Sequence, residues 1–271
     1  MKTHPLEYAK LTWPEVAAVV AEDRVCVIPV ATLEDHGPHL PIDTDLLIVS
    51  EVCRRACAEA AEDAVLLPAI PHGYDPHHMD FPGPISISWD TFTRYLTDVG
   101  VSLARHGFKR MLFVNGHGSN QSFVDAAARL VGVEHPDVLA ASSFYLVNEA
   151  GRRVIEEVRE SARGGMGHAC ELETSIYLVL DETAVKMEDA VDETGFPASD
   201  DLYMDWSDGP LRLMPRWSSF SRTGVQGRPT LARAEKGRVL LDAAVEEIAG
   251  YIGELRTLPL PVRREPSVTP E

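Results

Sequence analysis

Residues 24–50 read RVCVIPVATLEDHGPHLPIDTDLLIVS, and this stretch decides the fold class that we predict. Its first part, residues 24–32, is an apolar run rich in β-branched side chains, which is typical of a strand buried on both faces. Polar residues follow at once, and from Asp45 onward the apolar spacing is helical, with Thr44 in position to cap the helix. The stretch therefore predicts a strand, a loop rich in metal-binding residue types, and a helix.

The same pattern recurs along the chain. Further strands are predicted at residues 64–70, 110–114 and 138–144. Further helices are predicted at residues 89–106, 123–132 and 234–255, and residues 167–180 form a helix or a loop that leads into one. Strands that alternate with helices over connections of this length predict an α/β fold with a mostly parallel sheet covered by helices on both faces.

Residues 181–229 interrupt this alternation, because proline and glycine recur there and acidic residues cluster. The segment includes the aromatic residues Phe196, Tyr203, Trp206 and Trp217. Since a plain linker is not this aromatic, we predict an irregular excursion that covers the functional site. No break in composition divides the chain, and 45% hydrophobic content is enough for a large core, so we expect residues 1–271 to form a single domain.

The net charge limits the partners of the protein. Acidic residues number 42 and basic residues 25, which gives a formal charge of −17 that is spread along the chain. Such a surface repels nucleic acid and anionic membranes, so we expect neither as a partner and predict a small-molecule substrate.

The cysteines and the N-terminal residues predict a cytoplasmic protein. Four cysteines in 271 residues are too few for a disulfide framework, so we expect them to be reduced. Cys53 and Cys57 lie one helical turn apart and could bind a metal, but we favour a small apolar helix face. The sequence has no apolar signal-peptide run near residue 1 and no stretch of about 18 apolar residues.

Metal-binding residue types follow the predicted strands. Glu34 and His36 alternate at the end of the first strand, and Asp45 stands where the next helix begins. His117 follows the strand at 110–114 and is flanked by glycines that would let a metal approach, although NGHGSN alone is also an ordinary tight turn. Sites in such sheets form at the carboxyl ends of the strands, so these side chains should converge. Carboxylates and imidazoles without thiolates indicate an open catalytic site for Zn, Mn or Fe(II).

The segment HACELETS, residues 168–175, supplies two more predicted functional groups. On a helix, His168 and Glu171 share a face because they are three residues apart. We therefore predict Glu171 as a metal ligand and His168 as a proton carrier that reaches the substrate. Glu173 falls out of phase with them, and we interpret it as a carboxylate that supports the ligands or caps the helix.

For the other histidines, the sequence indicates a functional role less clearly. His72, His77 and His78 lie in the loop before FPGP, and we predict that His78 contacts the substrate. For each of the three, a solvated or loop-packing histidine is the alternative. His39 lies inside the first polar segment and is interpreted as support for the ligands.

Essentially the whole chain resembles the creatininase family, which comprises creatinine amidohydrolase and its relatives. The motifs that carry the resemblance occur in the family's order and are LEDHGPHLPIDTD (33–45), HHMDFPGPISIS (77–88), NGHGSN (115–120), HACELETS (168–175) and GVQGRPTLARAEKG (224–237). The resemblance implies a three-layer α/β/α sandwich, two divalent ions per chain (Zn, Mn or Fe) and a homo-oligomer, often a hexamer. Glu34 and His117 would bind one ion and His36 the other. Asp45 would bridge the two ions, and His168 matches the catalytic histidine.

Two positions depart from the pattern of creatininase itself. Where creatininase carries a glutamate ligand two residues after the motif histidine, this chain has Ser119, and we infer that Glu171 supplies the missing carboxylate. The residues before His168 read ARGGMG and lack the tryptophan and aspartate that embrace creatinine, so creatinine is not the expected substrate. Phe144 keeps an aromatic wall, and we predict that Ser119 and Phe144 join His78 in contacting the substrate.

The predicted reaction is hydrolysis of a carbon–nitrogen amide bond in a small substrate, either a cyclic amide or a formamide. Two cations about 3.5 to 4 Å apart would activate a water molecule, and His168 would protonate the departing nitrogen. Two other reactions remain as alternatives, namely cleavage of a carbon–carbon bond in a cyclic ketone such as a keto-inositol and peptide trimming in cofactor maturation. A metal-binding protein without catalytic activity is the alternative outside the enzymes.

Overall fold

A sheet of four parallel strands in the order β2-β1-β3-β4 forms the centre of the molecule, in a computed structural model that describes residues 6–207 and 209–262. The strands are β1 (Val25–Val30), β2 (Ala64–Leu66), β3 (Arg110–Asn115) and β4 (Leu139–Phe144). Every residue of β1 and β3 is buried, which explains why β1 and residues 111–114 of β3 are continuous apolar runs. The predicted strands are all present, and β2 ends before residue 70 because Pro68 has no N–H to continue the ladder.

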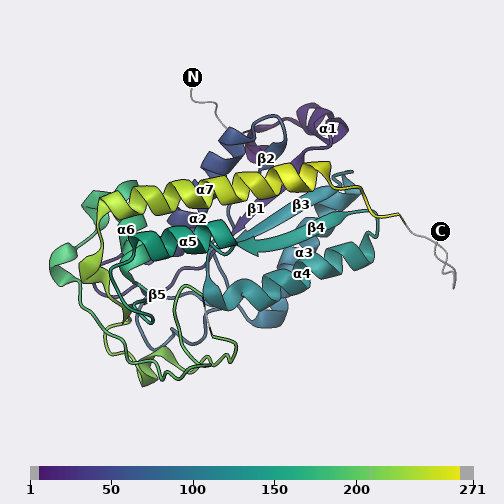
Figure 1. Cartoon of the computed structure of the whole chain (residues 1–271). Helices are drawn as coiled ribbons and strands as arrows, with labels where there is room; N and C mark the ends of the chain where they lie inside the picture. The colour runs from purple at the N-terminus through teal and green to yellow at the C-terminus, as the bar shows by residue number, and fades with distance from the viewer. Residues whose placement is uncertain (1–5, 208, 263–271) are drawn as a thin grey trace, which may run out of the picture.

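Helices cover both faces of this sheet (Figure 1). One face carries α2 (Thr44–Glu59), α5 (Glu149–Val158), α6 (Glu171–Leu180) and α7 (Ala234–Thr257). The other face carries α1 (Trp13–Ala21), α3 (Trp89–Arg105) and α4 (Gln121–Glu134). Successive side chains of β1 enter opposite layers, with Val27 in the apolar core under α2 and α7 and Ile28 in the core under α3 and α4. The predicted three-layer α/β/α fold is confirmed.

Two helices, α1 and α5, are absent from the sequence-based prediction. At the start of α1, Thr12 and Glu15 form a reciprocal capping box, and Pro14 occupies the first turn. Helix α5 begins at Asn148, whose side chain accepts a hydrogen bond of 2.7 Å from the N–H of Gly151. The sequence TWPE thus carried a helix-start signal that could have placed α1.

A small antiparallel sheet joins two distant segments beside the main one. It pairs β5 (Met166–His168) with β6 (Gln226–Gly227). Ala169 follows β5 with a φ of 49°, in the left-handed region, and α6 starts only at Glu171. The helix predicted within 167–180 is therefore present but shorter, and His168 lies in a strand.

The segment between α6 and α7 is irregular. It contains short 3₁₀ turns and β6, and Phe196, Met204 and Trp217 form an apolar cluster within it. In Figure 1 this segment, drawn in green, lies beyond the carboxyl ends of the strands. It therefore lies next to the loops in which the predicted ligands occur.

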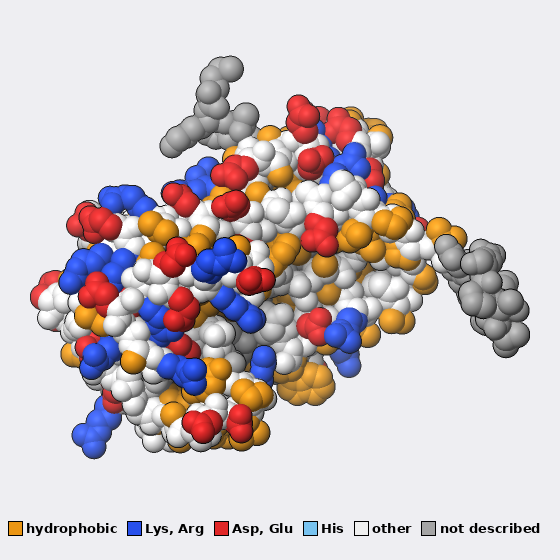
Figure 2. Space-filling model, in the orientation of Figure 1, with side chains coloured by type: hydrophobic (Ala, Val, Ile, Leu, Met, Phe, Trp, Pro, Cys, Tyr) orange, Lys and Arg blue, Asp and Glu red, His pale blue; other side chains and the backbone are white. Residues whose placement is uncertain are grey.

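The surface charges and the cysteines are arranged as the composition led us to expect. Figure 2 shows acidic and basic side chains interspersed over the face that it draws. All four cysteines are free and buried, and Cys53 and Cys57 belong to the apolar core under α2, as their helical spacing predicted. Within residues 6–207 and 209–262, no helix combines the length and the apolar character that crossing a bilayer requires.

Candidate metal centre

The predicted ligands from three segments converge at one edge of the sheet. Glu34 and His36 follow β1, Asp45 lies in the first turn of α2, and His117 follows β3. Each of these four side chains is almost completely buried. The carboxyl ends of adjacent parallel strands thus bring acidic and imidazole groups into one space, as the sequence predicted.

Asp45 lies between two histidines. Its Oδ1 is 3.3 Å from Nε2 of His36, and its Oδ2 is 3.1 Å from Nδ1 of His117. Glu34 Oε1 lies 3.1 Å from the same nitrogen of His117 and 3.8 Å from Nε2 of His36. Donor atoms that each lie about 2.1 Å from one cation are separated from each other by distances of about this size.

Glu173 completes the group around His36. Its Oε1 lies 3.8 Å from Nε2 of His36, and the side chains of His36, Asp45 and Glu173 are close enough to hold one metal ion together. Its other oxygen accepts a hydrogen bond of 3.3 Å from the N–H of Cys170 and so caps α6, which confirms the capping part of its interpretation. Glu173 therefore reaches the site that the sequence analysis assigned to Glu171.

Glu171 faces away from the centre, which contradicts the prediction that it is a metal ligand. Its Oε1 accepts hydrogen bonds from the N–H of Glu160 at 2.9 Å and from Nζ of Lys236 at 2.5 Å, and its Oε2 accepts one from the N–H of Ser161 at 3.0 Å. The prediction failed because it placed His168 on the helix. The left-handed residue Ala169 separates the two elements, so the three-residue spacing does not put His168 and Glu171 on one face.

His168 has one ring nitrogen fixed by the backbone. Nε2 lies 2.7 Å from the carbonyl oxygen of Asp35, which can only accept, so Nε2 carries the proton and Nδ1 keeps a lone pair. Nδ1 lies 3.5 Å from Oε1 of Glu34. Burial, together with the neighbouring rings of His36 and His78, lowers the pKa of His168 well below its ordinary value. The ring is therefore neutral, and Nδ1 is the atom that can accept and return a proton.

Burial and neighbouring charges shift the pKa values of Glu34 and Asp45 in opposite directions. Burial raises the pKa of Glu34 well above its ordinary range, and the charges of Asp45 and Asp75 raise it further. Burial also acts to raise the pKa of Asp45, but the charge of His36 and the neighbouring His117 imidazole outweigh burial, so the pKa is lowered. The two carboxylates are thus unequal, and Asp45 is the one held ionised.

The buried donor atoms fit a divalent metal. Several of them have no hydrogen-bond partner in the described part of the chain, and these are Oε2 of Glu34, both ring nitrogens of His36, Oδ2 of Asp45, both oxygens of Asp75 and Nε2 of His117. Buried polar atoms are almost always satisfied in folded proteins. Mixed carboxylate and imidazole donors suit Zn, Mn or Fe(II), so a cation in this space would satisfy them.

Asp75 and His77 belong to the site although the sequence analysis did not assign them to it. The side chains of Glu34, Asp75, His77 and His117 form a second group that could hold a metal ion. Burial raises the pKa of Asp75 to about 7. Their signal was the segment YDPHH directly beyond the predicted strand at 64–70, which ends at the same sheet edge.

The centre opens into a cleft of about 740 Å³. The three predicted substrate contacts, His78, Ser119 and Phe144, line this cleft. Oγ of Ser119 lies 3.0 Å from Nε2 of His77, and the ring of Phe144 meets that of Trp206 edge to face, with centroids 5.3 Å apart. Nδ1 of His78 is 2.6 Å from Oδ1 of Asp35, so His78 is held in place by a carboxylate.

The irregular segment forms the opposite wall of the cleft. The ring of Trp217 stacks on His78 with centroids 4.2 Å apart and meets the ring of His168 at 4.8 Å. Its indole N–H donates to the carbonyl oxygen of Gly224 at 2.8 Å, which fixes the ring. Other cleft-lining residues of this segment are Phe196, Leu202, Tyr203, Met204, Trp206, Leu211, Leu213 and Met214.

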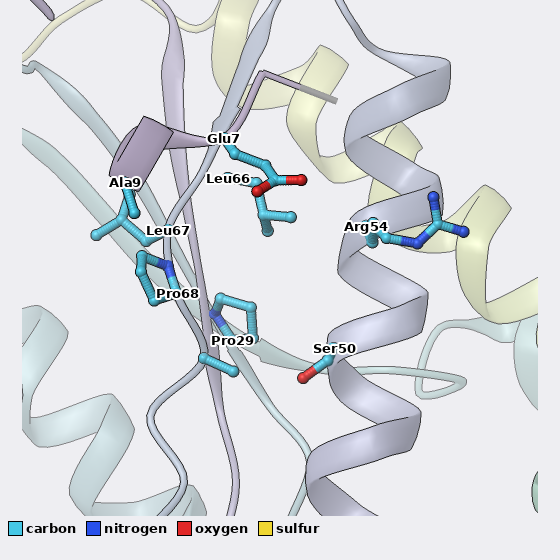
Figure 3. Close-up of a pocket in the computed structure, with 9 residues that line it drawn as sticks. Glu7, Ala9, Pro29, Ser50, Arg54, Leu66, Leu67 and Pro68 are labelled. Atoms are coloured by element: carbon cyan, nitrogen blue, oxygen red, sulfur yellow. The ribbon is translucent and has the colours of Figure 1, made fainter. Parts of the chain in front are cut away.

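A second hollow, of about 240 Å³, is lined by residues of β1, β2 and α2 among others and does not have these features (Figure 3). Figure 3 shows Pro29, Leu66 and Pro68 along it, with the carboxylate of Glu7 directed into the space. No group of metal-binding side chains occurs there among the residues that the structure describes. The functional site is therefore the cleft above the buried ligands.

Comparisons with known proteins show which proteins the chain resembles. A family model described as Creatininase: Creatinine amidohydrolase matches residues 9–252. Creatinine amidohydrolase of Pseudomonas putida is 30% identical over 262 residues, which cover 90% of this chain and 95% of that protein. A mycofactocin precursor peptide peptidase of Mycobacterium tuberculosis is 34% identical over 252 residues, covering 87% of this chain and 86% of the relative. A solved structure titled "Creatininase Mn" superposes with a TM-score of 0.78 at 27% identity, covering 94% of this chain and all of the other.

Proposed function

The chain belongs to the creatininase family, and from this premise we propose that it cleaves a carbon–nitrogen amide bond of a small substrate at a centre of two divalent metal ions. Family membership makes the protein a hydrolase of the amidohydrolase type, and the buried ligand groups support divalent-metal binding. A cyclic amide or a formamide is the proposed substrate class. We also propose a cytoplasmic homo-oligomer, with a hexamer as the form that the family resemblance implies, and light scattering would measure its mass.

The position of Asp45 between His36 and His117 carries this proposal. His36, Asp45 and Glu173 would hold one ion, and Glu34 and His117 would contribute to the other. When bound, divalent ions of this kind lower the pKa of a water molecule to near neutrality and polarise the carbonyl under attack.

His168 is placed to move the proton that the reaction requires. Its Nδ1 lone pair faces the ligands, so this atom can accept a proton from the attacking water and return it to the departing nitrogen. The carbonyl oxygen of Asp35 holds Nε2–H, which fixes the tautomer and the ring. The ring of Trp217 lies against His168 and limits the access of bulk water to this transfer.

Peptide trimming is a second candidate, and the size of the cleft favours it. About 740 Å³ is far more than a small ring occupies, and it lies in the upper part of the range usual for ligand pockets. Leu211, Leu213 and Met214 line the cleft and are each about half exposed, so they could contact the apolar side chains of a peptide. The mycobacterial relative is named for a peptide substrate, and it matches most of this chain.

A substrate panel separates these candidates. Protein loaded with Zn, Mn or Fe(II) would be assayed against lactams, N-formyl amides, short peptides, keto-inositols and creatinine. We expect turnover of an amide in the panel, none of creatinine, and loss of turnover in Glu173→Gln. Cleavage of keto-inositols alone would contradict the amide proposal, while turnover of peptides alone would favour the second candidate.

A further inference from the structure

Two exposed arginines line the cleft. Arg152 lies in α5, and Arg212 lies in the irregular segment between α6 and α7. Neither side chain forms an ion pair or a hydrogen bond with a residue that the structure describes. Guanidinium groups recognise carboxylates and phosphates, because their paired N–H donors match the oxygens of these anions. The two side chains are therefore candidates for contacts with an anionic part of the substrate.

Other arginines of the same two segments do have acidic partners. On α5, Arg153 lies 3.5 Å from Glu149. In the irregular segment, Arg216 lies 2.9 Å from Asp80. The chain has 42 acidic and only 25 basic residues, so a shortage of carboxylates does not explain why the two cleft-lining arginines are left without one.

The carboxylates that line the cleft are already engaged. Asp205 accepts two hydrogen bonds from Arg159, at 2.9 and 3.2 Å, and one from the N–H of Met166 at 3.0 Å. The other acidic residues of the lining belong to the groups that would hold the metal ions, and these are Glu34, Asp45 and Glu173. The charges of the two arginines therefore remain uncompensated in the cleft. Charges more than about 10 Å away are screened at physiological salt, so the acidic surface does not cancel them.

The start of α5 holds the backbone of Arg152 in a fixed position. The turn before the helix contains Leu146, which lines the cleft with a φ of 56°. Oε1 of the buried Glu247 accepts hydrogen bonds from the N–H groups of Val147 and Asn148 at 3.1 and 3.2 Å. Because these bonds fix the turn, binding of an anion requires only the arginine side chain to become ordered.

Arg212 has apolar neighbours on the same wall. Leu211 is 59% exposed, Leu213 and Met214 are each 49% exposed, and all three line the cleft. Adjacent apolar side chains that remain in contact with water are suited to bind an apolar part of a ligand. A ligand that reaches Arg212 therefore meets a positive charge beside an apolar surface.

We propose that Arg152 and Arg212 bind an anionic group of the substrate, a carboxylate or a phosphate, outside the metal centre. The substrate class is then an amide that carries an apolar part and a negative charge. This inference rests on the proposed function, because it names the substrate class of the same cleft. Binding measurements can test the charge preference even if no amide is hydrolysed.

The test is calorimetric titration of the metal-loaded full chain with matched probes. N-acetyl-leucyl-leucine is compared with its carboxamide, and N-acetyl-leucyl-phosphoserine amide with the corresponding serine amide. We expect wild type to bind an anionic probe about tenfold more tightly than its neutral match, and this preference to fall to about threefold or less in Arg152→Gln and in Arg212→Gln. A preference within the first pair alone identifies a carboxylate, and one within the second pair alone identifies a phosphate. Where a probe is hydrolysed, the His168→Gln background slows the reaction during the titration.

Arg153→Gln and Arg222→Gln are matched controls, because these arginines lie in the same two segments but do not line the cleft. Both should keep the wild-type preference. Equal binding of the two members of each pair, or binding of neither, would overturn the inference. So would a preference that survives in Arg152→Gln and Arg212→Gln, since the metal ions would then bind the anion.

The same measurements separate this inference from the proposed reaction. A charge preference that is lost in both arginine variants, without turnover of any amide, would uphold the inference and contradict the reaction. Turnover of an amide without any charge preference would uphold the reaction and overturn the inference.

Discussion

Glu171 and Glu173 lie two residues apart at the start of α6 and have opposite surroundings. Around Glu171, two backbone N–H groups and Lys236 satisfy both oxygens of the carboxylate. Around Glu173 lie His36 and Asp45, and both ring nitrogens of His36 lack partners. A buried carboxylate with complete hydrogen bonding holds the fold together, whereas one that faces unsatisfied donor atoms marks a binding site.

The largest effect is expected for Glu173→Gln. The amide keeps the hydrogen bond that caps α6 but is a poor metal ligand, so the ion at His36 should be lost while the helix start stays intact. Losing several kcal/mol of transition-state stabilisation corresponds to a fall in kcat of about a thousandfold or more. Steady-state kinetics and metal analysis would check this. Full metal content with an unchanged kcat would remove Glu173 from the centre.

His168→Gln separates proton transfer from metal binding. Because the ring contributes a proton acceptor, its loss should lower kcat by about a hundredfold or more while both ions stay bound. The measurement is kcat together with metal content, with wild type as the reference. If kcat were unchanged, another group would have to carry the proton.

Glu171→Gln should have the opposite effect to Glu173→Gln, lowering stability and leaving the metal content unchanged. Among the residues that the structure describes, the change leaves Glu160, at 2.7 Å, as the charged partner of the Lys236 ammonium. We expect a loss of about 2 kcal/mol in the free energy of unfolding, the size usual for hydrogen bonds to charged groups, with unchanged metal content. Urea unfolding of the two metal-loaded proteins would measure it. Loss of an ion in this variant would restore Glu171 as a ligand.

The hydrogen bonds of Glu171 also predict how the free energy of unfolding depends on pH. Burial acts to raise the pKa of Glu171, but hydrogen bonds from Lys236, Ser161 and Glu160 outweigh burial and lower it. The unfolded glutamate therefore binds its proton at a higher pH than the folded one, and the stabilisation is lost as pH falls through the folded pKa. The stability difference between wild type and Glu171→Gln should be full at neutral pH and shrink below about pH 4. A difference that grew on acidification would contradict this assignment.

The smallest effect is expected on the cleft wall, away from both glutamates. Phe144 packs against Trp206 and lines the cleft, and its ring offers no metal-binding atom. Phe144→Leu should therefore raise KM by about tenfold or less, with kcat and metal content nearly unchanged. A large fall in kcat with constant KM would mean that this wall acts in the transition state.

The sheet and its ligand edge were predictable because buried parallel strands have continuous apolar sequences and end at one edge. That pattern predicts from the sequence alone that Glu34, His36, Asp45 and His117 converge. The first turn of α6 was not predictable from spacing, since the left-handed φ of Ala169 rotates the helix relative to His168. A positive φ at alanine has no sequence signal, because glycine and asparagine are the usual residues there.

Asp75 was missed for a different reason. A polar loop after a strand can point in many directions, and here its path is fixed by Ser86, further along the same loop, and by Asn120, which is distant in sequence. Such tertiary hydrogen bonds leave no local pattern. Only the position of YDPHH at the correct sheet edge hinted at its role.

The cover of the cleft, residues 181–233, supplies aromatic and apolar wall residues but none of the grouped metal-binding side chains found among the described residues. The grouped metal-binding side chains and this part of the cleft wall are therefore encoded in separate stretches of the gene. Mutation can rewrite the cover without disturbing the ligands, so new specificities can evolve from one inherited catalytic centre. The relatives named for creatinine and for a precursor peptide are what such divergence would produce.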